Sequence, residues 1–313
     1  MYDIIGDVHG YASLLKKLLL QLGYEKTLDG YKHPERKAVF VGDFVNRGPE
    51  IRKTVRIIKK MVENGNAVAI LGNHEIYAIT YSLKDKDGTF VVKTRSKNYL
   101  ALHKTIREYV GFSEEWKEHI EWMLKLPLYL DLGDIRIVHA CWSDPLIEWL
   151  KENKTKGKSS RDIFKKVYKK PKSKTAKNIN ILTKGIDFKM PGNLKLINNK
   201  GVSPQSFRLR WWEDLTGKTF EEISFESKFT LPGYEIPSHL IPNLPGYNEN
   251  EPIVFFGHYC RHNGPYIIKP NICCVDSCVA GSKTLTAYSW NGEKTLNAEN
   301  LVHIRKSISI LNE

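Results

Sequence analysis

Six side chains of the types that bind divalent metal ions lie in five short motifs spread along the chain. The motifs are GDVHG at 6–10, GDFVNRGP at 42–49, GNHE at 72–75, VHA at 138–140 and GHY at 257–259, and the side chains are Asp7, His9, Asp43, Asn73, His139 and His258. Carboxylate, amide and imidazole donors in this mixture suit Mn²⁺, Fe, Zn²⁺ or Co²⁺ better than Ca²⁺. Two such ions roughly 3.5 to 4 Å apart acidify a water molecule between them, and that water can attack phosphorus. The motifs therefore predict a two-metal hydrolytic centre.

The spacing of the ligands suggests how they divide between the two ions. Asp7 and His9 are two residues apart, so an extended loop can direct both of them to one ion. Asp43 can bridge the ions with its two carboxylate oxygens. Asn73 and the two separate histidines, His139 and His258, then complete the second ion. We expect two divalent ions, with Mn²⁺ preferred and Fe, Zn²⁺ or Co²⁺ as alternatives.

Two further side chains in the motifs can act on a phosphate group. Arg47 follows Asp43 by four positions and offers a planar fork of N–H donors to phosphate oxygens. His74 stands beside Asn73 and can protonate the departing oxygen as a general acid. Taken singly, each would be interpreted as an ordinary surface or core residue. Their place in an ordered set of motifs at predicted strand ends favours a catalytic interpretation.

A short apolar stretch precedes each motif. These stretches are rich in Val, Ile and Phe and nearly continuous, as is typical of strands covered on both faces; they are Tyr2–Ile5, Ala38–Val41, Ala67–Leu71, Ile135–Val138 and Ile253–Phe256. Leucines at helical spacing over 14–22 end at Gly23, and a second helical pattern over 51–62 lies between Pro49 and Gly65. The first seventy residues or so are therefore predicted to form a βαβαβ unit, which brings three metal-binding loops to one sheet edge.

The last part of the chain is predicted to be rich in strands. Ile272–Val275 and Thr284–Trp290 match the pattern of strands. Asn291 and Gly292 form a strong signal for a two-residue hairpin, which leads into a further strand over Glu293–Leu296. Strands are therefore predicted on both sides of the segment between the fourth and fifth motifs.

Length and composition limit the class of protein. A chain of 313 residues with 41% hydrophobic residues can bury a large core. It contains no apolar run of the roughly 18 residues that a membrane helix needs. No signal peptide is recognisable, because Asp3 and Asp7 interrupt the first apolar stretch. We therefore expect a cytoplasmic protein with no membrane partner.

The five cysteines follow neither a disulfide nor a zinc pattern. Their number is odd and they lack paired CxxC spacing, so we expect buried, unpaired thiols; they are Cys141, Cys260, Cys273, Cys274 and Cys278. Cys141 and Cys260 lie two residues after His139 and His258. As an alternative to an inert buried thiol, one of these two could be an oxidation-sensitive neighbour of the metals.

Positive charge is concentrated in one segment. The formal net charge is +13, and residues 151–177 contain twelve Lys or Arg against two acidic residues, a local net charge of +10. Two interpretations remain open: a solvated, partly mobile loop, or an electrostatic collar for an anionic substrate or partner. Because Phe164 and Tyr168 are the only aromatic residues of this segment, base stacking has little support and a nucleic-acid partner is not expected.

The motif SFRLRWWED at 206–214 places two arginines beside two tryptophans. A strand here would present Arg208 and Arg210 on one face, because side chains alternate between the faces of a strand. This face belongs either to the active site or to an amphipathic edge strand with aromatic packing. Both interpretations remain open.

The ordered motifs GDVHG, GDFVNRGP and GNHE, followed by the histidines of VHA and GHY, resemble those of the calcineurin-like metallophosphoesterases. They are most similar to the phosphoprotein phosphatase branch, which also contains bacterial diadenosine tetraphosphatases. The resemblance covers roughly 1–80, 134–145 and 205–298. It implies an α/β fold, a four-layer α/β/β/α sandwich of two mixed β-sheets flanked by helices. It also implies one domain over 1–313 with a lysine-rich insertion at about 146–204. For the site, it implies the same division of metal ligands as above, with His74 as the general acid and Arg47 as a ligand of the phosphate.

The chain departs from the family pattern at one position. The second motif usually reads GDxxDRG, and here Asn46 replaces the second carboxylate. In the family that carboxylate pairs with the histidine of the third motif and helps to keep it protonated. An amide can orient His74 but stabilises its positive charge less. The branch also usually has a second arginine on the phosphate, and Arg210, with Arg208 behind it, is the candidate.

The resemblance implies a metal-dependent phosphohydrolase and leaves several substrates open. The first hypothesis is a serine/threonine protein phosphatase acting on phosphorylated proteins, which Glu75 in GNHE favours. The alternative is a dinucleoside polyphosphate hydrolase of the bis(5'-nucleosyl)-tetraphosphatase kind, which the basic insertion favours. A nucleic-acid phosphodiesterase and an inactive binding protein are the remaining hypotheses. The positive charge of the chain supports the phosphodiesterase hypothesis, and Asn46 is the only residue that supports an inactive binding protein.

Overall fold

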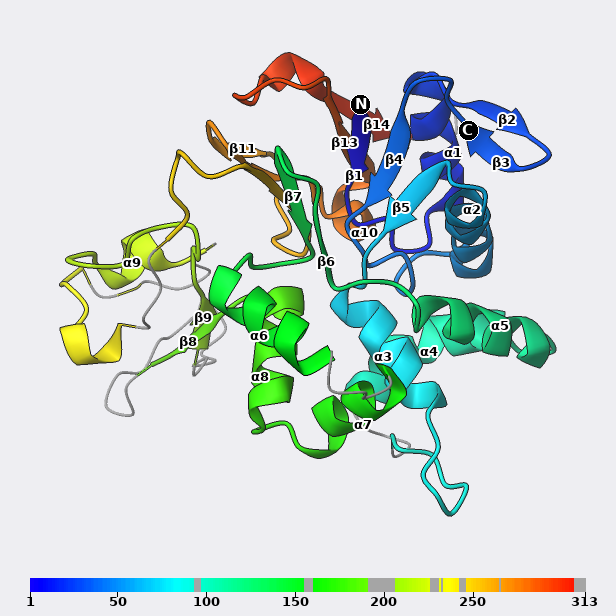
Figure 1. Ribbon diagram of the computed structural model, residues 1–313, viewed down its shortest axis with the longest axis horizontal. Coiled ribbons are helices and arrows are strands. Elements are labelled where there is room, and N and C mark those ends of the chain that lie inside the picture. Colours follow the sequence, from blue (N-terminus) through cyan, green and yellow to red (C-terminus); the bar gives the residue numbers. More distant parts are fainter. Residues whose placement is uncertain are drawn as a thin grey trace, which may run out of the picture. The chain divides into compact units, whose positions relative to one another are not determined.

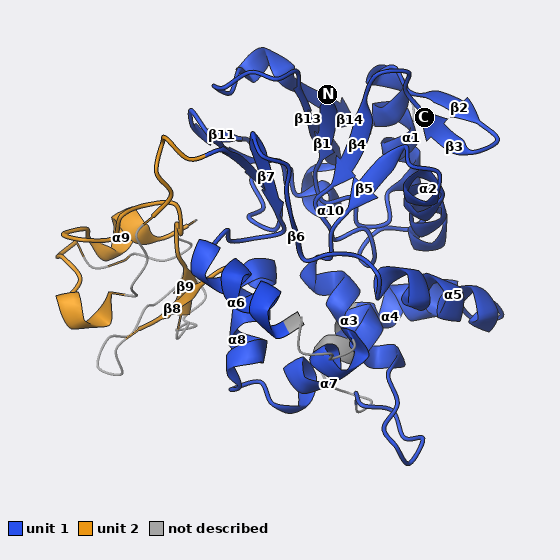
Figure 2. Ribbon diagram, in the orientation of Figure 1, with its two compact units in different colours: residues 1–184, 252–313 blue, residues 185–251 orange. Residues whose placement is uncertain are grey.

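The computed structural model describes residues 1–92, 97–154, 160–190, 206–225, 231, 233–241, 246–264 and 266–306. The chain divides into two compact units, which Figure 2 shows in different colours: unit 1 comprises 1–184 and 252–313, and unit 2 comprises 185–251. The predicted insertion at 146–204 crosses this boundary. The interpretation as one domain with an insertion stays a prediction.

Two mixed five-stranded sheets form the centre of unit 1 (Figure 1). The first has the order β14 (Leu301–Arg305), β13 (Thr284–Trp290), β1 (Tyr2–Ile5), β4 (Lys37–Phe40), β5 (Ala67–Ala69). The second has the order β11 (Ile267–Lys269), β12 (Ile272–Cys274), β10 (Ile253–Phe256), β7 (Ile135–Val138), β6 (Tyr129–Asp131). Strands β1, β4 and β5 are parallel to one another, and so are β7, β10 and β12. The strands predicted before the five motifs are therefore confirmed, with ends that differ by one or two residues.

The core of unit 1 lies between the two sheets. Ile4 and Val39 from the first sheet belong to the same buried cluster as Ile137 and Phe255 from the second. Helices α1 (Ala12–Gln21) and α2 (Ile51–Glu63) pack against the first sheet, α1 on β13 and β14 and α2 on β5. Strands buried on both faces explain the nearly continuous apolar sequence of the parallel strands. The predicted α/β fold with two mixed sheets flanked by helices is confirmed.

Helices gather around the third motif. Helix α3 (Asn73–Ser82) starts at Asn73 and contacts four others, which are α4 (Lys97–Glu108), α5 (Ser113–Met123), α7 (Ser160–Lys169) and α8 (Lys174–Lys184). Together with α6 (Asp144–Lys154), α7 and α8 make the described part of the lysine-rich segment helical. The interpretation of this segment as a solvated loop is therefore wrong for these residues, because Phe164, Val167 and Leu182 bury an apolar face. No helix in the described ranges is both long and apolar enough to cross a membrane.

Unit 2 has a small core of its own. Strands β8 (Asp187–Lys189) and β9 (Ser206–Arg208) pair antiparallel, and α9 (Phe220–Ile223) and a 3₁₀ turn (Ser238–Leu240) complete it. Its buried cluster includes Phe188, Phe207 and Phe220. The predicted strand at SFRLRWWED is short, since β9 ends at Arg208, and the tryptophans that follow pack on Tyr247 and Phe225.

The predicted hairpin at Asn291 and Gly292 is wrong. Strand β13 does pair antiparallel with its successor, but β14 starts only at Leu301, after a 3₁₀ turn over Ala298–Asn300. Glu293 explains the difference, because its carboxylate accepts hydrogen bonds from the Tyr288 hydroxyl and from the Asn291 N–H, both at 2.7 Å. These bonds hold Glu293 beside the end of β13, and the Leu296 N–H donates to Pro270 O at 2.8 Å rather than to β13. A separate antiparallel ribbon, β2 (Glu25–Thr27) and β3 (Gly30–Lys32), follows α1.

Candidate metal centre

The six predicted metal ligands come together at one edge of unit 1. Asp7 and His9 follow β1, Asp43 follows β4, Asn73 begins α3 after β5, His139 follows β7 and His258 follows β10. Carboxyl ends of neighbouring parallel strands lie at the same sheet edge, and the loops beyond them are free to carry polar side chains. The two stacked sheets therefore deliver ligands from five different loops to one place.

Asp43 lies at the centre of the cluster. Its Oδ1 is 3.3 Å from His139 Nε2, and its Oδ2 is 3.6 Å from His9 Nε2. His139 Nε2 is also 3.2 Å from Asn73 Oδ1. One donor atom from each of Asp43, His139 and His258 lies within 4.8 Å of the other two. Asp43 thus faces His9 with one oxygen and His139 with the other, as a bridging carboxylate would.

Asp7 joins the cluster through the loop after β10. Its carboxylate accepts a hydrogen bond from the backbone N–H of His258 at 3.2 Å. Burial, together with the neighbouring carboxylates Asp276 and Asp43, raises the pKa of Asp7 well above its usual range. Asp276 follows β12 and is also buried. Asp276 was not predicted as a site residue, because its place beside Asp7 depends on the pairing of β12 with β10.

The site residues fit a divalent cation. Asp43 is 1% exposed, and among the described residues no group donates a hydrogen bond to its Oδ2. Burying an unpaired carboxylate oxygen costs free energy that a bound cation would offset. Imidazole, carboxylate and amide donors of this kind are those of Mn, Fe, Zn or Co sites. The orphaned oxygen therefore marks a place for a positive charge.

Two ligand histidines are held in a defined tautomer by backbone carbonyls. The Nδ1–H of His9 donates to Val45 O at 3.0 Å, and that of His139 donates to Val41 O at 2.7 Å. The Nε2 atoms therefore face the cluster, as in many metal sites. Burial lowers the pKa of His9 to about 3 and outweighs the attraction of Asp43, so His9 is neutral and its Nε2 lone pair is available.

The pKa of His139 is shifted in the opposite direction from that of His9. Burial lowers its pKa, but the carboxylate of Asp43 outweighs this effect, and the net pKa of His139 is raised. Burial likewise raises the pKa of Asp43, but His139 and His74 outweigh it and hold that pKa well below its usual range. Asp43 and His139, whose facing atoms are 3.3 Å apart, thus shift each other's pKa in opposite directions.

The loops of the site have an unusual backbone. His9, Asp43, Asn46, Arg47 and His258 all have positive φ values, between 43° and 68°. Side chains other than glycine rarely adopt this left-handed conformation, which costs about 1 kcal/mol or more per residue. Backbone strain of this kind gathers at functional sites, where the surrounding structure must hold it in place.

Glycines allow the loops to approach each other. A Cβ atom at Gly72 would lie 2.2 Å from Asp43 Oδ1, and one at Gly257 would lie 2.1 Å from Asp7 Oδ1. Neither distance leaves room for a methyl group. This contact explains why glycine precedes the ligand in the motifs GNHE and GHY.

Glu75 holds two of the loops together and was not assigned this role from the sequence. Its buried carboxylate accepts four backbone N–H groups, from Asp43 at 2.7 Å, Gly72 at 2.9 Å, Phe44 at 3.0 Å and Val45 at 3.1 Å. Burial and Asp43 raise the pKa of Glu75 to about 7, while these donors act in the opposite direction. The signal available in the sequence was the position of Glu75 as the third residue of a helix, where a glutamate can accept hydrogen bonds from backbone N–H groups near the start of the helix.

His74 contacts Asn46, its predicted partner, and lies close to Arg47. Thr105 donates its hydroxyl proton to Asn46 Oδ1, so the Asn46 Nδ2 group is directed at His74 Nδ1, 2.6 Å away. The proton of a neutral His74 is then on Nε2, which lies 3.4 Å from Nη2 of the exposed Arg47. Burial lowers the pKa of His74 to about 4, opposed by Asp43 and reinforced by Arg47. Asn46 thus orients a neutral imidazole, in agreement with the weaker charge stabilisation expected of an amide.

The arginines predicted as further phosphate ligands lie in unit 2. Arg208 ends β9, and Arg210 is exposed and donates from Nε to Ser224 O at 2.8 Å. Their predicted role on the phosphate stays a prediction.

The prediction for the cysteines is wrong in part. Cys260 and Cys278 form a disulfide, whereas Cys141, Cys273 and Cys274 are free and buried. Burial raises the pKa of each free thiol. The two bonded residues are 18 positions apart and lie in the loops after β10 and β12, so only the adjacency of these strands brings them together.

Residues 2–262 match the sequence profile of the calcineurin-like phosphoesterases. The chain belongs to this family. It is 34% identical over 143 residues to the bis(5'-nucleosyl)-tetraphosphatase PrpE (asymmetrical) of Oceanobacillus iheyensis, which covers 44% of this chain and 54% of that relative. It is 39% identical over 80 residues to a symmetrical bis(5'-nucleosyl)-tetraphosphatase of Marinomonas, covering 25% and 26%. The chain spans about half, or less, of the length of the curated relatives it matches.

A likeness to a solved structure extends over more of the chain. A mutant of the cold-active protein tyrosine phosphatase superposes with a TM-score of 0.50 at 16% identity, covering 91% of this chain and 74% of that one. At this level of identity the likeness shows the fold alone.

Proposed function

We propose that this protein is a metal-dependent phosphohydrolase. One observation carries the proposal: five candidate ligands from four loops gather around a sixth, the buried carboxylate of Asp43, whose Oδ2 has no hydrogen-bond donor among the described residues. Membership of the calcineurin-like phosphoesterases supports it. Two divalent ions with Mn²⁺ preferred, and a cytoplasmic location, are parts of the same proposal.

In this proposal Asp7, His9 and Asp43 hold one ion, and Asp43 shares the second with Asn73, His139 and His258. Two divalent ions bound there would supply Lewis acidity and a water of lowered pKa. Every other task falls to side chains of the protein.

Arg47 and His74 are the residues that would contact the substrate directly. The exposed guanidinium of Arg47 would bind phosphate oxygens and hold the phosphorus in line for attack. His74 would give a hydrogen bond from Nε2 to the oxygen that leaves, with its ring held by Asn46 at Nδ1. Protonation of the leaving oxygen is most valuable for a basic alkoxide, whereas a phosphate leaving group needs it less.

We favour a dinucleoside polyphosphate as the substrate over a phosphorylated protein. The curated relatives with the names given above support this choice, and so does the neutral state of His74, because a departing nucleotide phosphate is a weaker base than the alkoxide of serine or threonine. The protein phosphatase hypothesis keeps the support of Glu75 in GNHE, and the assay below decides between the two.

The test is a side-by-side turnover assay with Mn²⁺ on diadenosine tetraphosphate and on a phosphothreonine peptide. Asp43→Asn serves as the blank, and Asp29→Asn, at an exposed position between β2 and β3, is the matched control. We expect faster cleavage of the dinucleotide, lost in Asp43→Asn and kept in Asp29→Asn. Faster release of phosphate from the peptide would make the protein a phosphoprotein phosphatase instead. Equal rates for wild type and blank on both substrates would refute phosphohydrolase activity on either class.

A further inference from the structure

The last turn of α8 is attached to the loop that carries His139. The carbonyl oxygen of Leu182 accepts a hydrogen bond from the backbone N–H of Ala140, the residue after His139, at 2.9 Å. Leu182 and Thr183 are fully buried, while the next residue, Lys184, is only partly buried. This attachment fixes the C-terminal end of α8, and the backbone of Lys184 with it, beside the metal centre.

The ammonium of Lys184 lies over an aromatic ring that borders His74. Its Nζ is 5.1 Å from the centre of the Tyr77 ring, within range of a cation–π contact. The Tyr77 ring is in turn 5.6 Å from the His74 ring, edge to face. After burial, and with Arg47 and His139, Lys184 is one of the positive groups that lower the pKa of His74. The Tyr77 ring therefore lies between the ammonium of Lys184 and His74, the predicted general acid.

The surroundings of Lys184 differ from those of the lysines of unit 1 that form ion pairs. Lys59 pairs with Glu63 and Glu118, and Lys169 pairs with Asp85. Among the residues that the structure describes, no carboxylate pairs with Lys184, and its contact is the neutral face of Tyr77. A partly accessible cation without a counter-charge, next to a predicted phosphate site, is suited to bind a second anionic group.

We propose that Lys184, held by Tyr77, forms a subsite for a phosphate group of the substrate other than the one under attack. Arg47 contacts His74 from the loop after β4, and Lys184 approaches it from α8 by way of Tyr77, so the two cations come from different elements. A substrate with one phosphate uses the Arg47 site alone. A polyphosphate chain also reaches the ammonium of Lys184, which binds phosphate as a point charge on a flexible stem. The inference rests on the proposed function and names the class of substrate: compounds with two or more linked phosphates.

The experiment compares substrates that differ in the number of phosphates. Lys184→Gln removes the charge and shortens the side chain by one atom, and Lys184→Arg restores a charge. Lys177→Gln removes an exposed charge from the same helix and is the matched control. KM and kcat are measured with Mn²⁺ in fixed excess for diadenosine tetraphosphate and for p-nitrophenyl phosphate. Binding of inorganic tripolyphosphate and of orthophosphate to the same Mn²⁺-loaded proteins is measured by calorimetry.

We expect Lys184→Gln to raise the KM for the dinucleotide and the Kd for tripolyphosphate about tenfold, as loss of one charged contact does. The values for p-nitrophenyl phosphate and orthophosphate should stay within about twofold. Lys184→Arg should recover most of the affinity, and the salt dependence of KM for the dinucleotide should become shallower in Lys184→Gln.

Three results would overturn the subsite. They are an equal loss with single-phosphate ligands, no loss with either class, and the same loss in Lys177→Gln, which would mean a diffuse effect of positive charge. These outcomes differ from failure of the proposed function, which appears as equal turnover by the wild type and Asp43→Asn. The calorimetric arm reports on Lys184 even if diadenosine tetraphosphate is not the preferred substrate.

Discussion

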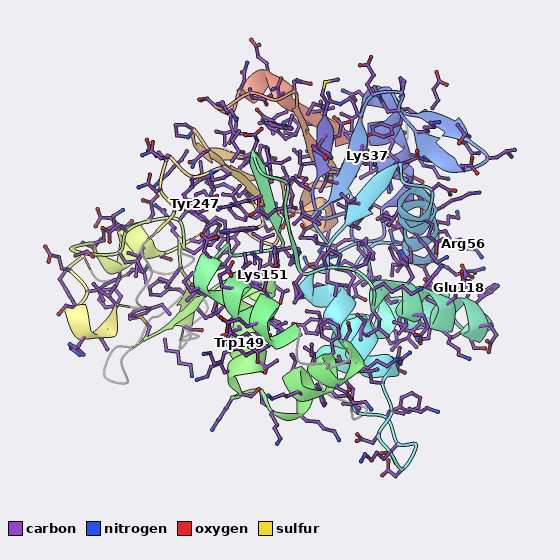
Figure 3. The ribbon with its side chains drawn as sticks, in the orientation of Figure 1. Lys37, Arg56, Glu118, Trp149, Lys151 and Tyr247 are labelled. Atoms are coloured by element: carbon purple, nitrogen blue, oxygen red, sulfur yellow. A yellow bond between two sulfur atoms is a disulfide. The ribbon has the colours of Figure 1, made fainter. Side chains whose placement is uncertain are left out.

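Unit 1 contains two dense clusters of charged groups that are built in opposite ways. Between α2 and α5, Glu115 accepts from Arg52 at 2.7 Å and from Arg56, and Glu118 accepts from Lys59 at 2.7 Å. Figure 3 labels Arg56 and Glu118 on these two helices. At the metal centre, by contrast, the buried Oδ2 of Asp43 has no donor among the described residues.

The pKa values of Glu115 and Asp7 are shifted in opposite directions. Burial raises the pKa of Glu115, but hydrogen bonds from Arg56 and Arg52 outweigh it and the net pKa is lowered. For Asp7, burial and two further carboxylates act in the same direction and raise the pKa. The first cluster is electrostatically complete in the folded chain and serves stability. The second is incomplete, and it is completed only by something that binds there.

The strongest test of this contrast is removal of the bridging carboxylate. Asp43→Asn should lower kcat/KM at least about 1,000-fold, because both ions would lose a shared ligand. The thermal midpoint of the metal-free variant should fall by only about a few degrees, because the asparagine keeps an oxygen that can accept from the His74 N–H, and only the attraction between Asp43 and His139 is lost. Steady-state kinetics and thermal unfolding with a chelator measure the two quantities. A strongly destabilised metal-free variant would contradict the view of Asp43 as a functional rather than a structural charge.

Metal binding should stabilise the incomplete cluster. At a free Mn²⁺ concentration of 100 times Kd, the free energy of unfolding should rise by about 2.7 kcal/mol. For a chain of this length the thermal midpoint should rise by about 4 °C. Thermal unfolding with Mn²⁺, then with excess chelator, checks the effect and its reversal. A shift of the same size in Asp43→Asn would place the stabilising ion elsewhere.

A carboxylate at position 46 should change the charge of His74. Asn46→Asp adds a negative charge at Nδ1, which raises the pKa of His74 from its lowered value and keeps the imidazolium to higher pH. Activity at alkaline pH should then rise, by at most about threefold for each half unit by which the pKa moves. The profile of kcat against pH measures this, with Asn250→Asp at an exposed position as the control for net charge. An unchanged profile would count against coupling between residue 46 and His74.

The smallest effect is expected in the complete cluster. Glu115→Gln should lower the free energy of unfolding at pH 7 by about 1 kcal/mol, without loss of activity. Because folding lowers the pKa of Glu115, its contribution is fully present above the ordinary carboxyl pKa and is lost as the pH falls through the lowered pKa. Denaturant titrations of both proteins at pH 7 and near pH 3 should show a difference that disappears at the acidic pH. A larger difference near pH 3 than at pH 7 would reverse the predicted sign.

Local pattern was enough to predict the elements that carry the metal ligands. Continuous apolar stretches that end in Gly-Asp, Gly-Asn or Gly-His predict both the strands and the residues at their ends. Glu75 and Asp276 were missed because their roles depend on which loops meet in space. The disulfide between Cys260 and Cys278 was not predicted for the same reason, because it requires β10 and β12 to be neighbours.

Two other predictions, the hairpin at Asn291 and the loop in the lysine-rich segment, were wrong because longer-range interactions outweigh local sequence preferences. The signal of Asn291 and Gly292 is a local preference, and hydrogen bonds from Tyr288 and Asn291 to Glu293 override it. In the lysine-rich segment, charge concealed the helical spacing of Phe164 and Val167, whose burial decides the structure. Lys184 could not be singled out from the other lysines, because only its contact with Tyr77 distinguishes it.

The close approach of Gly72 to Asp43 and of Gly257 to Asp7 has a consequence for how such a chain can diverge. Neither position can gain even one carbon atom without moving a ligand, whereas the helical segment between β7 and β10 has no such restriction. Over evolutionary time, substitutions and insertions should therefore accumulate between the motifs while these two glycines stay fixed. New segments such as the one that contains Lys184 can therefore be added or changed, while the sheet edge that carries Asp7 and Asp43 is inherited unchanged.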